Sequence, residues 1–137
     1  MRLVLDTNVF ISGVFFSGPP YQVLEAWRDG RFELVISDEI LTEYRRVSDT
    51  LAAQFPGVDL APILDLVARE ADLIQAPNLS EQVCVDPDDD KFLACALAGN
   101  TGIIVSGDRH LLQVKGYRGI EVCRPREFVD LYLKDNL

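Results

Sequence analysis

Residues 3–8 read LVLDTN, a run of three apolar residues that ends on an acid. Such a run predicts a short buried strand. An acid directly after the strand lies at its carboxyl end, and ligands of open α/β sheets bind outside that edge. Asp6 therefore marks both the first predicted strand and the first candidate functional residue.

Short apolar runs and amphipathic segments alternate along the rest of the chain. The predicted strands cover residues 3–5, 32–36, 73–74, 103–105 and 120–123. The predicted helices cover residues 21–29, 38–47, 60–71, 91–98 and 125–132. This alternation is typical of α/β proteins with a parallel sheet. We predict one domain over residues 1–137, with a three-layer α/β/α, Rossmann-like fold around a mostly parallel sheet of four or five strands.

The composition limits the classes of function. A hydrophobic share of 48% indicates a globular chain, and no apolar run has the length of a membrane span. The three cysteines are widely separated and Asp6 interrupts the first apolar run, so we expect a cytoplasmic protein with reduced thiols and no secretory signal. The net charge of −9 has the wrong sign for binding nucleic acid, unless cations cancel part of it.

Four acids are candidates for one site. Asp6 directly follows the strand at residues 3–5, Asp108 comes three residues after the strand at 103–105, and Asp90 begins the helix between them. Glu43 lies roughly 60° from the centre of the buried stripe of its helix, on the margin of that face. Each acid alone can be explained as a helix cap, a turn residue or a surface ion pair. Together they would repel one another, and oxygen ligands without His or Cys favour Mg²⁺ or Mn²⁺ among them.

Four short motifs resemble those of the PIN-domain nucleases, in the same order and over nearly the whole chain. They are DTNV at 6–9, LTEY at 41–44, DDKFLACA at 89–96 and VSGD at 105–108. The resemblance is closest to the small prokaryotic members, many of which are ribonuclease toxins restrained by an antitoxin.

The resemblance implies roles for the acids in these motifs. Asp6, Glu43, Asp90 and Asp108 would be catalytic residues and ligands of Mg²⁺ or Mn²⁺, supported by Ser106. We expect Asp6 and Asp90 to bind the metal directly and Asp108 to bind it directly or through water. Glu43 is expected to orient the attacking water or to hold a second ion.

The acidic run at residues 86–90 leaves a choice of register. Asp90 fits the spacing of the family, whereas Asp88 and Asp89 are interpreted as helix-entry residues, and Asp86 could approach the metal. A second acid often follows the last one by two positions in the family, and His110 stands at that place in this chain.

Several neighbours of the acids are candidates for supporting roles. Asn8 and Ser106 are expected to orient the carboxylates. Lys91, Arg109 and His110 are candidate contacts with substrate phosphates, although ordinary surface charge explains them equally well.

The predicted function is that of a metal-dependent endoribonuclease that hydrolyses phosphodiester bonds of single-stranded RNA, as the toxin of a toxin-antitoxin pair. The alternatives are a catalytically silent PIN-like binding protein and a solitary RNA-processing nuclease without an antitoxin. A haloacid-dehalogenase-type phosphatase would need an Asp at the position of Asn8, and a phospho-receiver domain would need an acidic pair at Asp6.

The expected partners are RNA, an antitoxin and a second copy of the chain, with no membrane. Apolar residues 14–16 are either a contact surface for a partner or buried.

Overall fold

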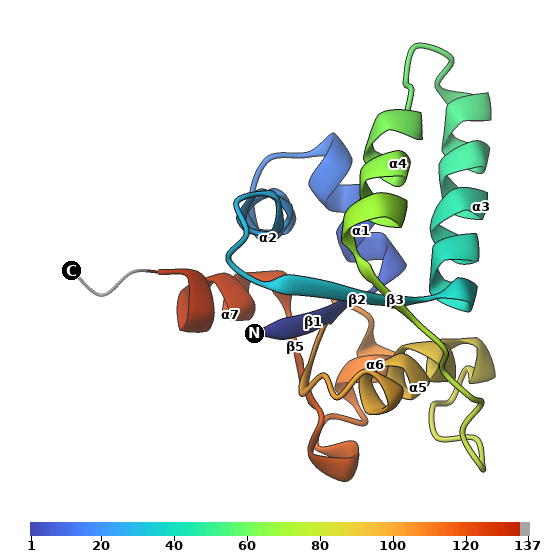
Figure 1. Ribbon diagram of the computed structural model, residues 1–137, viewed down its shortest axis with the longest axis vertical. Helices are drawn as coiled ribbons and strands as arrows, with labels where there is room; N and C mark the ends of the chain where they lie inside the picture. The colour runs from blue at the N-terminus through green and yellow to red at the C-terminus, as the bar shows by residue number, and fades with distance from the viewer. Residues whose placement is uncertain (135–137) are drawn as a thin grey trace.

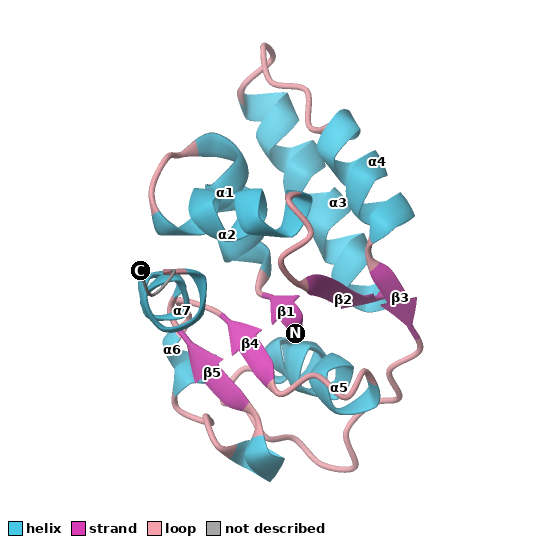
Figure 2. Cartoon of the chain, turned by 60° about the vertical axis from the view of Figure 1, so that its left-hand side comes forward, coloured by secondary structure: helices cyan, strands magenta, loops and turns pink. Residues whose placement is uncertain are grey.

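Five parallel strands form the centre of the fold. The computed structural model describes residues 1–134 and orders the strands β3-β2-β1-β4-β5 (Figure 2). The strands are β1 (Arg2–Leu5), β2 (Glu33–Ser37), β3 (Asp72–Ile74), β4 (Ile103–Val105) and β5 (Glu121–Cys123). All neighbouring pairs run parallel. The predicted parallel sheet is confirmed.

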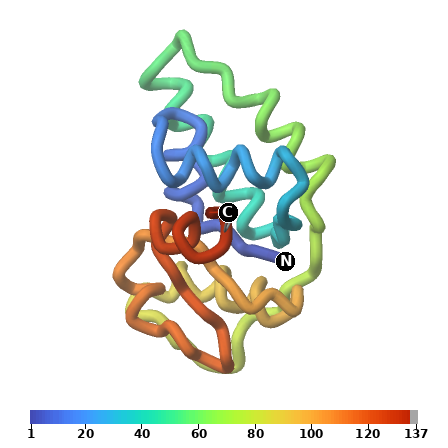
Figure 3. Tube along the Cα trace, turned by 90° about the vertical axis from the view of Figure 1, so that its left-hand side faces the viewer, coloured from blue at the N-terminus to red at the C-terminus, as the bar shows by residue number. Residues whose placement is uncertain are grey.

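Helices cover both faces of this sheet (Figure 1). One face carries α1 (Thr7–Phe15), α2 (Pro19–Arg28), α3 (Asp38–Gln54) and α4 (Ala61–Glu70). The other face carries α5 (Asp90–Ala98) and α6 (Arg109–Leu112). Helix α7 (Pro125–Phe128) continues into one π-helical turn (Val129–Leu133), and both pack against α2 (Figure 3). The predicted three-layer α/β/α arrangement is confirmed, and no helix within residues 1–134 has the length and apolar character needed to cross a membrane.

Apolar residues of the strands and of α5 form the core. Leu3, Val4 and Leu5 of the first strand are completely buried. The stretch 92–96 of α5 is buried throughout, as its uniformly apolar sequence predicts. The core therefore fixes β1 and α5 relative to each other. It thereby also fixes the positions of Asp6 after β1 and of Asp90 at the start of α5.

The direction of winding reverses at β1. The chain adds β2 and β3 on one side of β1, and then β4 and β5 on the other. In sheets of this kind, ligands bind in the crevice outside the carboxyl ends of the strands at which the order reverses. Those strands are β1 and β4 here; Asp6 follows β1 directly, and Asp108 comes three residues after the end of β4.

Helices α1 and α2 approach each other closely at Gly13. A Cβ atom there would lie 2.7 Å from the carbonyl oxygen of Pro20 and 2.6 Å from Cδ1 of Leu24. Sequence patterning does not predict α1, because β-branched residues and a central glycine lower its helix propensity. The helix is stabilised instead by burial of Val9 and Phe10 in the core.

Replacing Gly13 by Ala should therefore destabilise the fold. We expect Gly13→Ala to lower the free energy of unfolding by about 1–3 kcal/mol, because α1 and α2 must move apart to accommodate the methyl group. Gly57→Ala is the matched control, since a Cβ at Gly57 meets nothing within 4 Å; it should change stability by less than about 0.5 kcal/mol. Urea unfolding measures both, and equal losses would contradict the close approach of the two helices.

Candidate functional site

Asp6 is the buried anchor of the site. It follows β1 directly, its backbone N–H donates to the carbonyl of Val105 at 3.0 Å, and only 5% of the residue is exposed. Its Oδ2 accepts a hydrogen bond from Ser106 Oγ at 2.7 Å. Burial raises the pKa of Asp6, and the negative charges of Asp108 and Glu43 raise it further, against the opposing effect of the Ser106 hydrogen bond.

Ser106 ties the ends of β1 and β4 together. Its completely buried hydroxyl donates to Asp6 and accepts the backbone N–H of Asp108 at 2.9 Å. Asp108 in turn accepts the backbone N–H of His110 at 2.7 Å and so caps α6. The structure thus brings Asp6, Ser106 and Asp108 together at the carboxyl edge of the sheet.

Asp90 is engaged with a neighbouring loop instead. Its two carboxylate oxygens accept the backbone N–H groups of Val83 at 3.0 Å and Cys84 at 2.7 Å. The carboxylate therefore fastens the preceding loop to the first turn of α5. Both oxygens of Asp90 therefore have a backbone partner, and the role of Asp90 as a metal ligand beside Asp6 stays a prediction.

Asp89 faces the acidic cluster in the place expected of Asp90. Burial and the negative charges of Asp108, Asp86 and Asp6 raise the pKa of Asp89 to about 6. Its Oδ2 is buried and has no hydrogen-bond partner within residues 1–134. Burial and like charges therefore both disfavour the ionised form of Asp89 in the metal-free protein.

Asp89 and Asp90 are adjacent at the start of α5, but their side chains point in different directions, as a step of about 100° per residue requires. The apolar stretch that follows favours neither residue, because positions 92–96 are buried on all sides of the helix. Their contacts make the distinction: Asp90 accepts the N–H groups of Val83 and Cys84, whereas Asp89 lies 3.4 Å from His110 Nδ1. The helical path begins at Asp86, whose side chain accepts the backbone N–H two residues further on.

Glu43 lies at the edge of the cluster with its charge compensated. It accepts a hydrogen bond from the Thr7 hydroxyl and pairs with Lys91 Nζ at 2.7 Å and with Arg46 at 3.5 Å. The Lys91 side chain is only 8% exposed and also contacts the carboxylate and the carbonyl of Asp88, each at 2.9 Å. Burial acts to lower the pKa of Lys91, but its ion pairs with Glu43 and Asp88 outweigh that effect and raise it.

The residues predicted to support the acids, Lys91, Arg109 and Asn8, differ in burial and in their contacts. Lys91 is an internal ion-pair partner, whereas Arg109 is exposed at the start of α6. Asn8, predicted to orient the carboxylates, is exposed and has no side-chain hydrogen bond within residues 1–134. These positions leave Arg109 available at the surface for a ligand.

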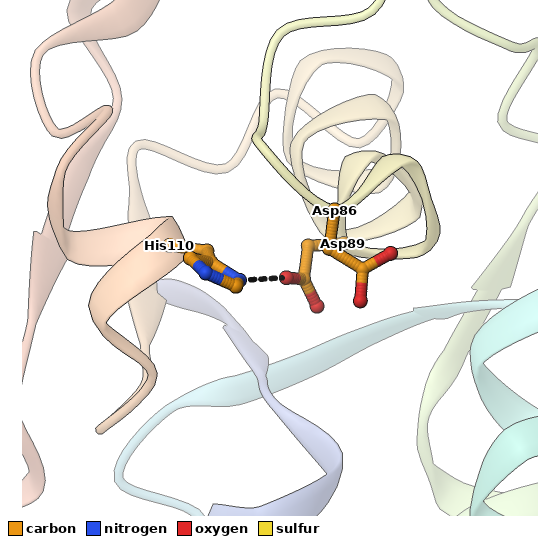
Figure 4. Close-up of side chains that lie close together, drawn as sticks. All are labelled: Asp86, Asp89 and His110. Carbon is orange, nitrogen blue, oxygen red and sulfur yellow. Dashed lines mark ion pairs between the residues drawn. The ribbon is translucent and has the colours of Figure 1, made fainter.

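His110 faces the acids from α6. Its Nδ1 lies 3.4 Å from Oδ2 of Asp89 (Figure 4). One ligand atom from each of Asp86, Asp89 and His110 lies within 4.8 Å of the other two. This cluster shares Asp89 with the group formed by Asp6 and Asp108.

The chemistry of the cluster suits a divalent cation. Asp6, Asp89 and Asp108 concentrate negative charge at one edge of the sheet. A buried oxygen that accepts no hydrogen bond destabilises the fold, and Oδ2 of Asp89 accepts none from residues 1–134, since its contact with His110 Nδ1 is 3.4 Å long. A donor set made mainly of carboxylate oxygens fits Mg²⁺ or Mn²⁺.

Comparisons with known proteins agree with this fold. The profile of the PIN domain family matches residues 2–110. An uncharacterised protein of Methanocaldococcus jannaschii is 26% identical over 145 residues, which cover 98% of this chain and 93% of that protein. A chain in the crystal structure of VapBC2 from Rickettsia felis, bound to a DNA fragment from their promoter, has a TM-score of 0.59 and 16% identity. The match covers 90% of this chain and 98% of that chain, and at this identity it shows a shared fold.

Substitution of Asp89 and Asp88 should change the stability of the metal-free protein in opposite directions. The raised pKa of Asp89 means that its ionisation destabilises the fold as the pH rises from about 4, the unfolded pKa, to about 6. Asp89→Asn should therefore raise the melting temperature at pH 7 by a few degrees, and the gain should shrink as the pH falls towards 4.

Asp88 is the matched control, because the ion pair with Lys91 lowers its pKa. Asp88→Asn should lower the melting temperature at pH 7, and that loss should shrink only below about pH 4. Calorimetry in the presence of a chelator measures both variants. A lower melting temperature for Asp89→Asn than for the wild type at pH 7 would contradict the crowding of charge around Asp89.

Proposed function

The chain belongs to the PIN domain family, and we propose that it is a metal-dependent endoribonuclease that hydrolyses phosphodiester bonds of single-stranded RNA. One observation carries the proposal: Asp6, Asp89 and Asp108 are crowded at the carboxyl edge of the sheet, and a buried oxygen of Asp89 accepts no hydrogen bond from residues 1–134. Such crowding is unfavourable for the fold alone and becomes favourable around a dication.

We assign metal binding to Asp6, Asp89 and Asp108, with Asp86 at the exposed side of the cluster. When bound, Mg²⁺ or Mn²⁺ would polarise the phosphodiester, lower the pKa of a coordinated water and stabilise the departing oxyanion. The chain itself orients the ligands. Ser106 holds Asp6 through a 2.7 Å hydrogen bond, which removes the rotational freedom that a buried carboxylate would otherwise keep.

Asp90 contributes in this proposal by positioning its neighbour. Its hydrogen bonds to the backbone N–H groups of Val83 and Cys84 fix the loop against the start of α5. Asp89 is the adjacent residue, so the direction of its carboxylate depends on that anchoring.

An exposed cation at the border of the site helps to explain how an acidic protein would bind RNA. Lys91 does not serve this purpose, because its side chain is buried between Glu43 and Asp88 and pairs with both. Arg109 is exposed next to Asp108 and is the proposed contact for an RNA phosphate. Glu43, whose carboxylate is already paired, is proposed to orient the attacking water from the edge of the site.

A protein partner is the second part of the proposal. Residues 14–16 end on Phe16, which is 68% exposed, and Tyr21 of α2 is also exposed. These side chains offer an apolar surface to a second copy of the chain or to an antitoxin. A chain of similar fold comes from VapBC2, crystallised with promoter DNA.

We infer that this chain acts in the cytoplasm as the toxin of a toxin-antitoxin pair. A neighbouring gene for a small DNA-binding protein would support this role, and its absence would favour a solitary RNA-processing nuclease.

Purified protein with Mn²⁺ or Mg²⁺ should cleave single-stranded RNA. Asp6→Asn and Asp89→Asn should each reduce the cleavage rate by about 100-fold or more, because each removes a proposed metal ligand. Asp90→Asn should retain more activity than Asp89→Asn but should unfold more easily, since it weakens an anchor of the loop. A fluorescent RNA oligomer reports cleavage, and circular dichroism reports folding.

The adjacent pair of variants makes this test specific. Loss of metal binding and cleavage in a folded Asp90→Asn variant, with both retained in Asp89→Asn, would show that the ligands are wrongly assigned. Cleavage that a chelator leaves unchanged would contradict the requirement for a metal. Metal binding without cleavage of any RNA would favour the catalytically silent binding protein.

A further inference from the structure

His110 brings the only imidazole of the chain to the edge of the acidic cluster. It lies in the first turn of α6, where its backbone N–H donates to Oδ1 of Asp108 at 2.7 Å. The side chain is 27% exposed. The ring points from α6 towards Asp89, which lies in the turn before α5 (Figure 4).

The contacts of the imidazole are too long for good hydrogen bonds. Nδ1 lies 3.4 Å from Oδ2 of Asp89 and 3.8 Å from Oδ1 of Asp108. Hydrogen bonds from nitrogen to oxygen are usually between about 2.7 and 3.2 Å. Neighbouring ligands of an ion bound at about 2.1 Å are separated by roughly 3 Å or slightly more. The spacing between His110 and Asp89 is close to that of two ligands of one ion.

We propose that Nδ1 of His110 is a metal ligand, and that it makes this a mixed nitrogen-oxygen site that prefers Mn²⁺ and Co²⁺ to Mg²⁺. The inference rests on the proposed function, because it concerns the same site. Asp86 and Asp89 supply the oxygen atoms that lie within 4.8 Å of the imidazole nitrogen. Mg²⁺ selects oxygen ligands and keeps much of its hydration, whereas imidazole is a good ligand for later divalent metals.

A neutral donor suits this position for an electrostatic reason. Burial raises the pKa of Asp89, and the negative charges of three carboxylates, those of Asp108, Asp86 and Asp6, raise it further. Another carboxylate at position 110 would add to this repulsion. A neutral imidazole completes the donor set without adding negative charge, and its lone pair is available to a cation when the ring is unprotonated.

Pulsed electron paramagnetic resonance of the untagged protein loaded with Mn²⁺ tests the inference directly. Because the chain has one histidine, imidazole coupling to Mn²⁺ must come from His110. Protein labelled with ¹⁵N only in histidine should show ¹⁵N coupling in place of the ¹⁴N coupling of unlabelled protein. His110→Gln keeps a neutral side chain that can hydrogen-bond, so it should bind Mn²⁺ but lose this coupling.

Metal titrations give a second readout that does not depend on catalysis. The ratio of Co²⁺ to Mg²⁺ affinity should fall by about tenfold or more in His110→Gln, because an amide replaces the nitrogen ligand. The double variant His110→Gln/Gln113→His keeps one imidazole but moves it along α6 to an exposed position. It should behave like His110→Gln in both measurements.

The outcomes separate this inference from the proposed function. Mn²⁺ bound without imidazole coupling, or an unchanged affinity ratio in His110→Gln, would overturn the role of His110 and leave a metal-dependent nuclease in place. A protein that binds no Mn²⁺ at all would overturn both.

Discussion

Repulsion among carboxylates at the edge of a buried sheet is the constraint on which this structure depends. The reversal of strand order at β1 brings Asp6 and Asp108 to one crevice, and the start of α5 adds Asp89 to it. Carboxylates at such short range favour protonation or a bound cation. Burial raises the pKa values of Asp6 and Asp89, and the neighbouring negative charges raise them further.

The acids of this region differ in how far the protein compensates their charge. Lys91 pairs with both Glu43 and Asp88 on one side of the site, at 2.7 and 2.9 Å. Asp90 accepts two backbone N–H groups. Asp89 keeps a buried oxygen that accepts no hydrogen bond from residues 1–134. Glu43, Asp88 and Asp90 are thus stabilised by the protein itself, whereas Asp89 would be stabilised by the proposed metal ion.

Topology was easier to predict from the sequence than helical phase. Apolar runs identified the strands, and the edge rule for parallel sheets then placed Asp6 and Asp108 together without knowledge of any contact. The different surroundings of Asp89 and Asp90 could not be predicted, because buried residues follow both at helical spacing and adjacent helical side chains differ by about 100° in direction. The burial of Lys91 could not be predicted, because its partner on α3 is distant in the sequence. Helix α1 was not predicted, because it is stabilised by packing in the core and not by the helix propensity of its residues.

Anomalous X-ray diffraction from crystals soaked in Mn²⁺ would test the central claim most directly, because it locates the ion without reference to activity. A peak contacting Asp6 and Asp89, with Asp108 bound directly or through water, is the expected result. In the same map, the carboxylate of Asp90 should remain on the backbone of the preceding loop. A peak at Asp90 with Asp89 turned away, or no peak in the crevice between β1 and β4, would contradict the proposed metal site.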